Sequence, residues 1–219
     1  MQKRKLIIGD YDTALEGWTL SALDFPEPEP QNNFVEVPGR DGPLDLSTTL
    51  TDGEPRFGSR TLTATLECSN GIRADRTQLV SDIINRLHGR RLDIILPDAP
   101  ERYTTGRISV RKEYNDLAHA AVSISAVCDP WLYNQTETRL RLTASASEQL
   151  AALSNSGRRV VTPEVTVTGG PVKLACNGKS WELAAGTYRL PTLLLRPGNT
   201  ALTYSGAGTI SITYREAVL

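Results

Sequence analysis

The residues best suited to catalysis or metal binding are few and scattered. The chain holds two histidines, His88 and His119, and three cysteines, Cys68, Cys128 and Cys176. Nucleophilic catalysis needs a serine or cysteine beside a positioned base, and neither histidine lies in a motif that supplies one. A structural zinc site needs clustered ligands such as paired CxxC motifs, which these isolated residues do not form. We therefore expect no catalytic residue, no metal ion and no cofactor.

Two acidic segments, residues 41–45 and 52–54, come closest to a calcium loop. Both lack the ligand spacing of an EF-hand, and their Asp-Gly pairs are more typical of tight turns. The chain has no GxxxxGK[ST] phosphate loop, so nucleotide chemistry is not expected. A glycosidase needs two carboxylates on opposite sides of the bond it cleaves, and a sequence alone does not show which carboxylates face each other. An enzyme, either a glycosidase or a peptidase built on a β-sandwich, therefore stays an open alternative.

Composition excludes several other classes. Of 219 residues 39% are hydrophobic, and 24 Lys+Arg against 25 Asp+Glu leave a net charge of -1. No basic footprint points to a nucleic-acid partner, and no apolar run reaches the roughly 18 residues of a membrane span. The short apolar stretch near the start is no signal-peptide core, so we expect synthesis in a cytoplasm. The odd, widely spaced cysteines are expected to be buried free thiols.

Charge divides the chain near residue 130. Residues 1–130 hold 15 Lys+Arg and 20 Asp+Glu, whereas residues 131–219 hold 9 and 5. The change coincides with Cys128-Asp129-Pro130-Trp131, where a strand pattern ends in a proline. We therefore expect two domains, residues 1–132 and 133–219.

The first domain is expected to be α+β. One helix, over about residues 73–88, has an apolar face at 3.6-residue spacing and places Arg76 outside. That face comprises Ile72, Leu79, Val80, Ile83, Ile84 and Leu87. Strand patterns cover residues 5–8, 18–23, 34–37, 61–68, 91–96, 106–112 and 120–128.

Residues 26–58 contain six prolines and four glycines around one short strand. A segment of that length without its own secondary structure is usually functional when it occurs in a compact domain. Because proline restricts φ, such a segment is stiffer than a Gly/Ser linker. We interpret residues 26–58 as an extended arm, with a mobile surface loop as the alternative.

The second domain is expected to be a small β-sandwich. Eight short strand candidates are spaced evenly along it, and Asn177-Gly178 is typical of a two-residue hairpin turn. The candidates are residues 138–142, 163–168, 172–176, 180–183, 187–190, 192–196, 201–204 and 209–214. Gly206-Ala207-Gly208 is expected to separate the last two strands.

Several segments together resemble the distal tail proteins (Dit) of long-tailed bacteriophages over almost the whole chain. Each segment alone is weak evidence for the resemblance, but the order and spacing of all of them together make the match fairly specific. They are residues 37–45, 60–66, 87–89, Tyr103 with 106–107, 128–133, 196–200 and 208–216.

The resemblance implies a β-rich N-terminal domain with one helix that assembles into a hexameric ring, and a C-terminal galectin-like β-sandwich. It also implies a hub at the virion tail tip, assembled in the host cytoplasm. One face would meet the tail tube protein and the other a tail-associated lysin-type or receptor-binding protein. The arm is then the candidate ring interface, through Val37, Gly39, Arg40, Asp41 and Gly42. Arg40 and Asp41 either pair between subunits or simply fix a turn.

The alternative function is a carbohydrate-binding module that recognises host cell-wall polysaccharide. Its one plausible stacking platform is Trp181, because residues 131–219 contain no histidine or aspartate to complete a galectin-type site. Trp181 is at best a weak candidate for a contact on the sandwich. We favour a core or interface position for it.

Overall fold

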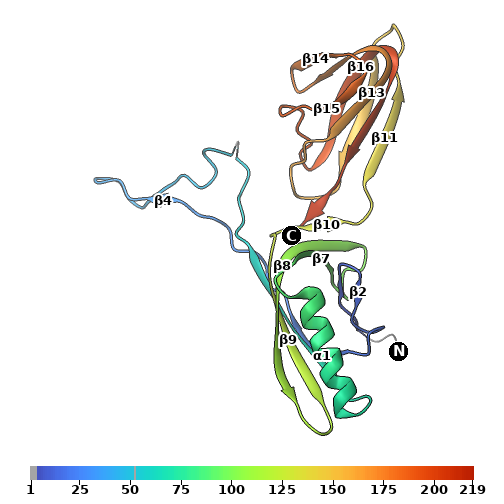
Figure 1. Ribbon diagram of the computed structural model, residues 1–219. Helices are drawn as coiled ribbons and strands as arrows, with labels where there is room; N and C mark the ends of the chain where they lie inside the picture. The colour runs from blue at the N-terminus through green and yellow to red at the C-terminus, as the bar shows by residue number, and fades with distance from the viewer. Residues whose placement is uncertain (1–3, 52) are drawn as a thin grey trace. The chain divides into compact units, whose positions relative to one another are not determined.

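The computed structural model describes residues 4–51 and 53–219. Asp52, from the second acidic segment, lies outside these described residues. Contacts divide the chain into two compact units, Met1–Pro130 and Trp131–Leu219, which appear in Figure 1. Strands dominate both units, and α1 (Arg73–Leu87) is the one α-helix of the described residues. The predicted fold class, mainly β with a single helix, is confirmed.

The first unit contains an antiparallel sheet whose seven strands lie in the order β2-β1-β7-β8-β9-β6-β3. Their bounds are β1 Ile7–Ile8, β2 Tyr11–Asp12, β3 Thr19–Asp24, β6 Arg60–Cys68, β7 Arg91–Ile95, β8 Arg102–Asn115 and β9 Ala120–Cys128. A separate hairpin pairs β4 (Phe34–Val35) with β5 (Leu44–Asp45).

Alternating side chains give the sheet one buried and one polar face. Along β6, Leu62, Ala64 and Leu66 are buried while the threonines between them are exposed or half-buried. The pairs Leu62 with Ala126 and Ala64 with Ile124 continue the buried face onto β9. α1 buries its apolar stripe, including Val80, Ile83 and Leu87, and its residues contact β8 and β9. Apolar side chains at every second position of the strands and at 3.6-residue spacing on the helix thus pack into one core.

Two predictions for the helix were wrong. Ile72, expected on the apolar face, lies one residue before α1 in extended conformation and is 68% exposed. Arg76, expected outside, is only 2% exposed. Its Nη1 donates to the Gly71 carbonyl (2.5 Å) and its Nη2 to the Leu117 carbonyl (2.8 Å). Arg76 therefore joins the start of α1 to the turn between β8 and β9, a turn some 40 residues away in sequence.

The second unit is built on one curled sheet of six strands. Its path is β11-β16-β13-β14, with β12 on β16 and β15 on β13. The bounds are β11 Thr138–Thr143, β12 Gln149–Asn155, β13 Glu164–Cys176, β14 Lys179–Leu183, β15 Gly186–Arg189 and β16 Gly198–Tyr214. β10 (Leu132–Asn134) pairs with β17 (Ala217–Val218). Both halves of β13 and β16 contribute side chains to a single core, as expected of a sandwich.

β13 and β16 are each longer than predicted, because a bend that we interpreted as a turn is a bulge. The register between them shifts between Gly169 and Val172, opposite Gly206 and Gly208. Gly206 has a φ of 131°, and a Cβ there would collide with the Pro171 carbonyl. Residues 192–196, predicted as a strand, contribute only the bridge of Leu195 to Val161, and β12 was not predicted.

Replacing Arg76 by methionine should lower the free energy of unfolding by about 2 kcal/mol, because buried carbonyls lose a charged donor. Arg73→Met is the matched control, since Arg73 is exposed on the same helix. Urea unfolding followed by circular dichroism measures both. Equal effects of the two substitutions would contradict the bridging role of Arg76.

Gly206→Ala should destabilise the second unit more than Gly198→Ala. Both glycines have positive φ, at 131° and 97°, so alanine is strained at either position. Only Gly206 adds a steric collision, because nothing lies within 4 Å of a Cβ built on Gly198. Thermal unfolding should show a lower midpoint for Gly206→Ala, and the reverse order would show that the bulge does not require glycine.

Candidate functional site

The arm, residues 26–58, is the most exposed part of the first unit. Residues 29–43 are all exposed, so this stretch packs on no core of its own chain. It leaves the sheet after β3 and returns to it at β6, as Figure 1 shows. Inside it, Phe34 pairs with Asp45 and Val35 with Leu44. The predicted strand over residues 34–37 is shorter than expected, ending at Val35.

Local hydrogen bonds hold the arm hairpin in shape. The Leu46 amide donates to the Asn33 carbonyl (2.8 Å), and the Asn33 amide donates to Ser47 Oγ (2.7 Å). Hydrogen bonds from Ser47 lower the pKa of Asp45 below its usual value, and one of them is the Ser47 amide at 2.9 Å from Oδ1. Two-stranded hairpins are only marginally stable alone, so these side-chain bonds matter for its order.

The arm tip contains the five candidate residues predicted from sequence. Gly39 and Gly42 adopt φ of 83° and 75°, which favours glycine. The Arg40 amide donates to the Val37 carbonyl (3.2 Å) and closes a turn. The side chains of Arg40 and Asp41 are exposed and form no ion pair within the described parts of the chain. The charged groups are therefore available to a neighbouring molecule.

The arm is anchored at its root by Arg60. The guanidinium lies 3.6 Å from the ring centroid of Phe25, and its Nη2 donates to the Phe25 carbonyl (3.0 Å). Burial lowers the pKa of Arg60, while the nearby Glu27 carboxylate, 4.0 Å away, opposes that shift. Arg60 thus joins the start of β6 to the segment that leaves β3.

A short ladder extends the root outward. The Gly58 amide donates to the Glu29 carbonyl (2.8 Å), and the Gln31 amide donates to the Arg56 carbonyl (2.8 Å). Pro30 and Phe57 form a bridge between the same two segments. The chain therefore enters and leaves the arm through a paired, directed base rather than two independent linkers.

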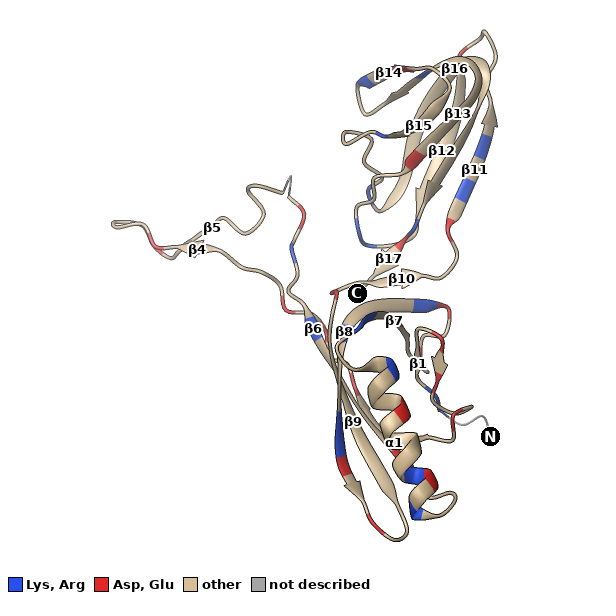
Figure 2. Cartoon of the chain, viewed as in Figure 1, with Lys and Arg blue, Asp and Glu red and all other residues tan. Residues whose placement is uncertain are grey.

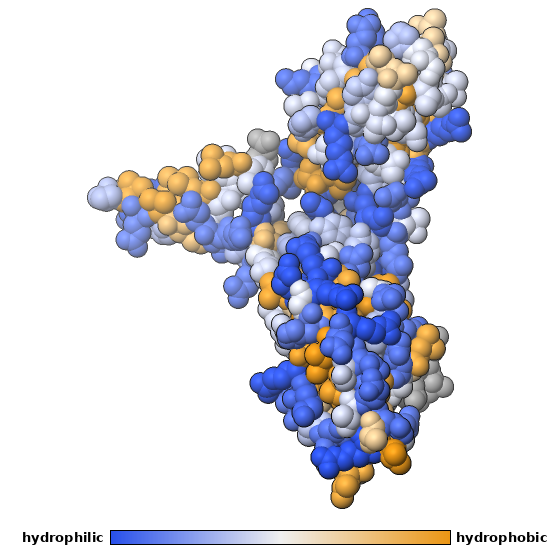
Figure 3. Space-filling view, viewed as in Figure 1, coloured by the Kyte–Doolittle hydropathy of each residue, from blue (hydrophilic) through white to orange (hydrophobic). Residues whose placement is uncertain are grey.

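Exposed apolar side chains are the feature of the arm that the sequence reasoning missed. Phe34 is 57% exposed, Val35 and Val37 are each 41% exposed, and Leu50 is 96% exposed. Figure 3 shows this apolar surface on the projecting arm, whereas charged residues are sparse at β4 and β5 in Figure 2. Three of the four residues from Phe34 to Val37 are apolar, and that was a signal for it. Contiguous exposed apolar surface is typical of an interaction site.

The residues considered for catalysis are spread apart. His88 follows α1, and its Nδ1 lies 3.1 Å from the Val110 amide. His119 belongs to the turn before β9. The three cysteines are free and buried, as predicted, and burial raises the pKa of Cys128 to about 11. The described residues contain no cluster of metal-ligating side chains and no helix able to span a membrane.

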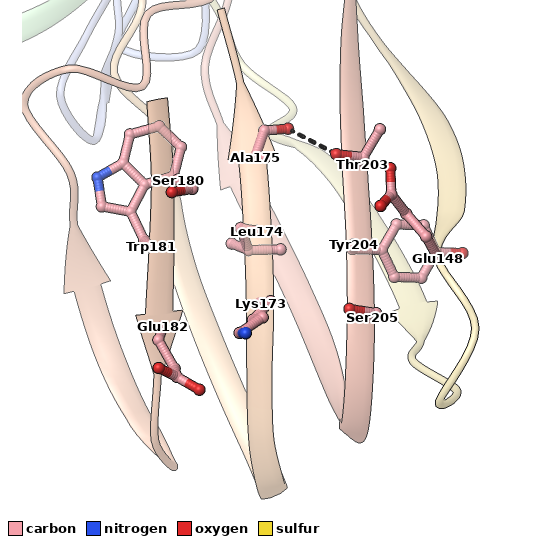
Figure 4. A pocket seen from close by; sticks show the side chains of 10 residues that line it. All are labelled: Glu148, Lys173, Leu174, Ala175, Ser180, Trp181, Glu182, Thr203, Tyr204 and Ser205. Atoms are coloured by element: carbon pink, nitrogen blue, oxygen red, sulfur yellow. Dashed lines mark hydrogen bonds between the residues drawn. The ribbon is translucent and has the colours of Figure 1, made fainter. Parts of the chain in front are cut away.

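A cavity of about 430 Å³ lies on the second unit, between β14, β13 and β16, and is drawn in Figure 4. Strand alternation places Trp181 in the row of Leu174 and Tyr204, and Trp181 packs against the buried core. Lys173 and Glu182 pair in the next row and belong to the opposite, polar face. Trp181 is half-buried and lines this cavity together with Lys173 and Glu182, as Figure 4 shows.

Comparison with solved structures gives the fold a known counterpart. No family model matches the sequence, and no curated protein matches it. The chain is similar to the protein described as "SPP1 Dit (gp 19.1) Protein, a Paradigm of Hub Adsorption Apparatus in Gram-positive Infecting Phages". The TM-score is 0.70 at 14% identity, covering 98% of this chain and 99% of that chain.

A second match is a chain of the phage P2 baseplate in its activated conformation with Ca, at TM-score 0.44 and 11% identity. It covers 97% of this chain and 98% of that one. The fold implied by the sequence resemblance is confirmed: over nearly its whole length, the chain has the fold of a phage distal tail protein.

Proposed function

We propose that this protein is a structural hub in the tail of a long-tailed bacteriophage or prophage. The observation that carries the proposal is the shared fold with SPP1 Dit over 98% of the chain. The two histidines lie far apart in the sequence and the three cysteines are buried, so these residues do not form a catalytic group. The protein's role is accordingly geometric: it holds other tail components in position at the virion tail tip, and it is not an enzyme.

The hub assembles as a ring of six copies. A closed ring needs a head-to-tail interface whose rotation closes, in which each copy offers one surface and receives another. The arm supplies the offered surface, because its root is held by Arg60 and its apolar side chains are unburied. One face of the ring meets the tail tube protein. The other meets a tail-associated lysin-type or receptor-binding protein.

The alternative function, binding of cell-wall polysaccharide, is less well supported by the site. Sugar stacking needs an exposed aromatic side chain, and Trp181, which lines the cavity of the second unit, is partly buried against the core. Retention of the purified chain on host wall polysaccharide, lost on Trp181→Ala, would favour that alternative over the structural hub.

The ring can be tested by light scattering after size exclusion. Six chains of 23.9 kDa should give a particle of about 143 kDa. Arg40→Glu should shift the distribution towards smaller species, because it reverses an exposed charge at the arm tip. Lys179→Glu, the same charge reversal on the exposed β14 of the second unit, should leave the ring intact. A particle of about 24 kDa at every concentration, with or without these changes, would contradict self-assembly through the arm.

A further inference from the structure

The polar face of the second unit is hollowed where a row of small side chains crosses its strands. The cavity of about 430 Å³ described above lies there. The register places Ser180 on β14, Ala175 on β13 and Thr203 on β16 in one row. Leu150 on β12, which is 71% exposed, ends that row because it pairs with Thr203. We call this hollow the cross-strand trough.

Charged side chains form the neighbouring row and one wall of the trough. Glu182 pairs with Lys173, and Lys173 pairs with Ser205 on β16. Glu148 directly precedes β12 and continues the row beyond Ser205. All four side chains line the cavity, as Figure 4 shows. The order of groups from β14 to β12 is therefore carboxylate, ammonium, hydroxyl and carboxylate.

These charges are not neutralised by their own chain. Glu148, Lys173 and Glu182 are exposed, and none of them forms an ion pair with another residue that the structure describes. Elsewhere on β13, by contrast, Glu164 lies 3.9 Å from Arg189. The two carboxylates and the ammonium of the trough are therefore available to a ligand.

The size and composition of the trough fit a segment of protein. Its volume lies within the range of about 300–1,000 Å³ that is typical of ligand sites. The half-buried Trp181 and the exposed Leu150 provide apolar contacts at its two ends. A neutral sugar would desolvate the carboxylates and the Lys173 ammonium without offering them opposite charges, which costs free energy. A peptide offers both charges.

The spacing of the carboxylates matches an extended peptide. Neighbouring strands lie about 4.8 Å apart, so Glu182 and Glu148, separated by three strand spacings, are about 14 Å apart at the backbone. Side chains on one face of an extended peptide recur about every 6.8 Å, so residues i and i+4 are also about 14 Å apart. Residue i+2 then lies over the interval between Lys173 and Ser205.

We infer that the cross-strand trough binds an extended segment of a neighbouring tail protein. Basic side chains at positions i and i+4 of that segment face Glu182 and Glu148, and an acidic side chain at i+2 faces Lys173. The inference rests on the proposed hub function and names a surface of the second unit that holds one of the protein partners. Opposite charges across the contact determine which segment is accepted and in which register.

Two synthetic peptides of opposite charge order test the inference. Acetyl-Lys-Val-Asp-Val-Lys-amide should bind the full chain at least about tenfold more tightly than acetyl-Asp-Val-Lys-Val-Asp-amide, because three attractive charge pairs become three repulsive ones. Fluorescence anisotropy of the two peptides, each with the same label, measures both affinities. Equal binding of the two peptides, or binding of neither, would overturn the inference.

Reversal of the trough charges should reverse this preference. A chain with Glu148→Lys, Lys173→Glu and Glu182→Lys should bind the second peptide more tightly than the first, and that result would also show that the variant is folded. The matched control exchanges an ion pair elsewhere in the second unit, through Glu164→Lys and Arg189→Glu. It should keep the preference of the unaltered chain. The same preference in the trough variant and the control would show that the peptides bind elsewhere.

A neutral sugar separates this inference from the alternative function. The trimer of N-acetylglucosamine should not displace the first peptide, and displacement would identify the trough as a sugar site instead. Light scattering separates the inference from the proposed hub, because the trough variant should still form the six-chain particle. If that particle forms but the unaltered chain does not distinguish the peptides, the inference alone is wrong. If no particle forms from the unaltered chain, the ring proposal fails, and the peptide preference still decides the role of the trough.

Discussion

The arm exposes apolar side chains that its own chain does not bury, and the proposed assembly depends on this exposed apolar surface. Phe34, Val35 and Val37 lie on a two-stranded hairpin with no helix or second sheet over it. Exposed apolar surface raises the free energy of an isolated copy by about 25 cal/mol per Å². A contact between copies would remove this cost, which is why the proposed ring places an interface on the hairpin.

Two buried arginines fix the backbone near the two ends of β6: Arg60 is its first residue, and Arg76 lies in the first turn of α1, after β6 has ended. Arg60 holds the arm root to Phe25, and Arg76 holds the start of α1 to the turn before β9. Both guanidinium groups are nearly inaccessible to water, and both satisfy part of their hydrogen bonding with backbone carbonyls. A buried cation is costly unless its partners are fixed. The two arginines therefore require an ordered arm root and an ordered helix start.

The second unit contributes a different kind of surface. Its long strands β13 and β16 curl about glycines. The half-buried Trp181 packs against the core and lines a cavity, while Lys173 and Glu182 lie on the polar face. A polar sheet face suits a protein partner recognised by hydrogen bonds and charge. Sandwich architecture does not by itself imply carbohydrate binding.

Local patterns in the sequence were sufficient for the strands β6 and β9, the helix α1 and the proline-rich arm, because their periodicity and backbone restrictions depend only on neighbouring residues. Asn177-Gly178 predicted its hairpin for the same reason. Tertiary structure decided the rest. Arg76 is buried because its acceptors come from residues 116 and 117, so no local pattern marks it. Gly206 and Gly208 lie inside a strand because β13 crosses them closely at a bulge, a contact between segments far apart in sequence. A depression of about 240 Å³ in the first unit likewise exists only where the turn before β3, the end of β6 and the start of α1 come together in space.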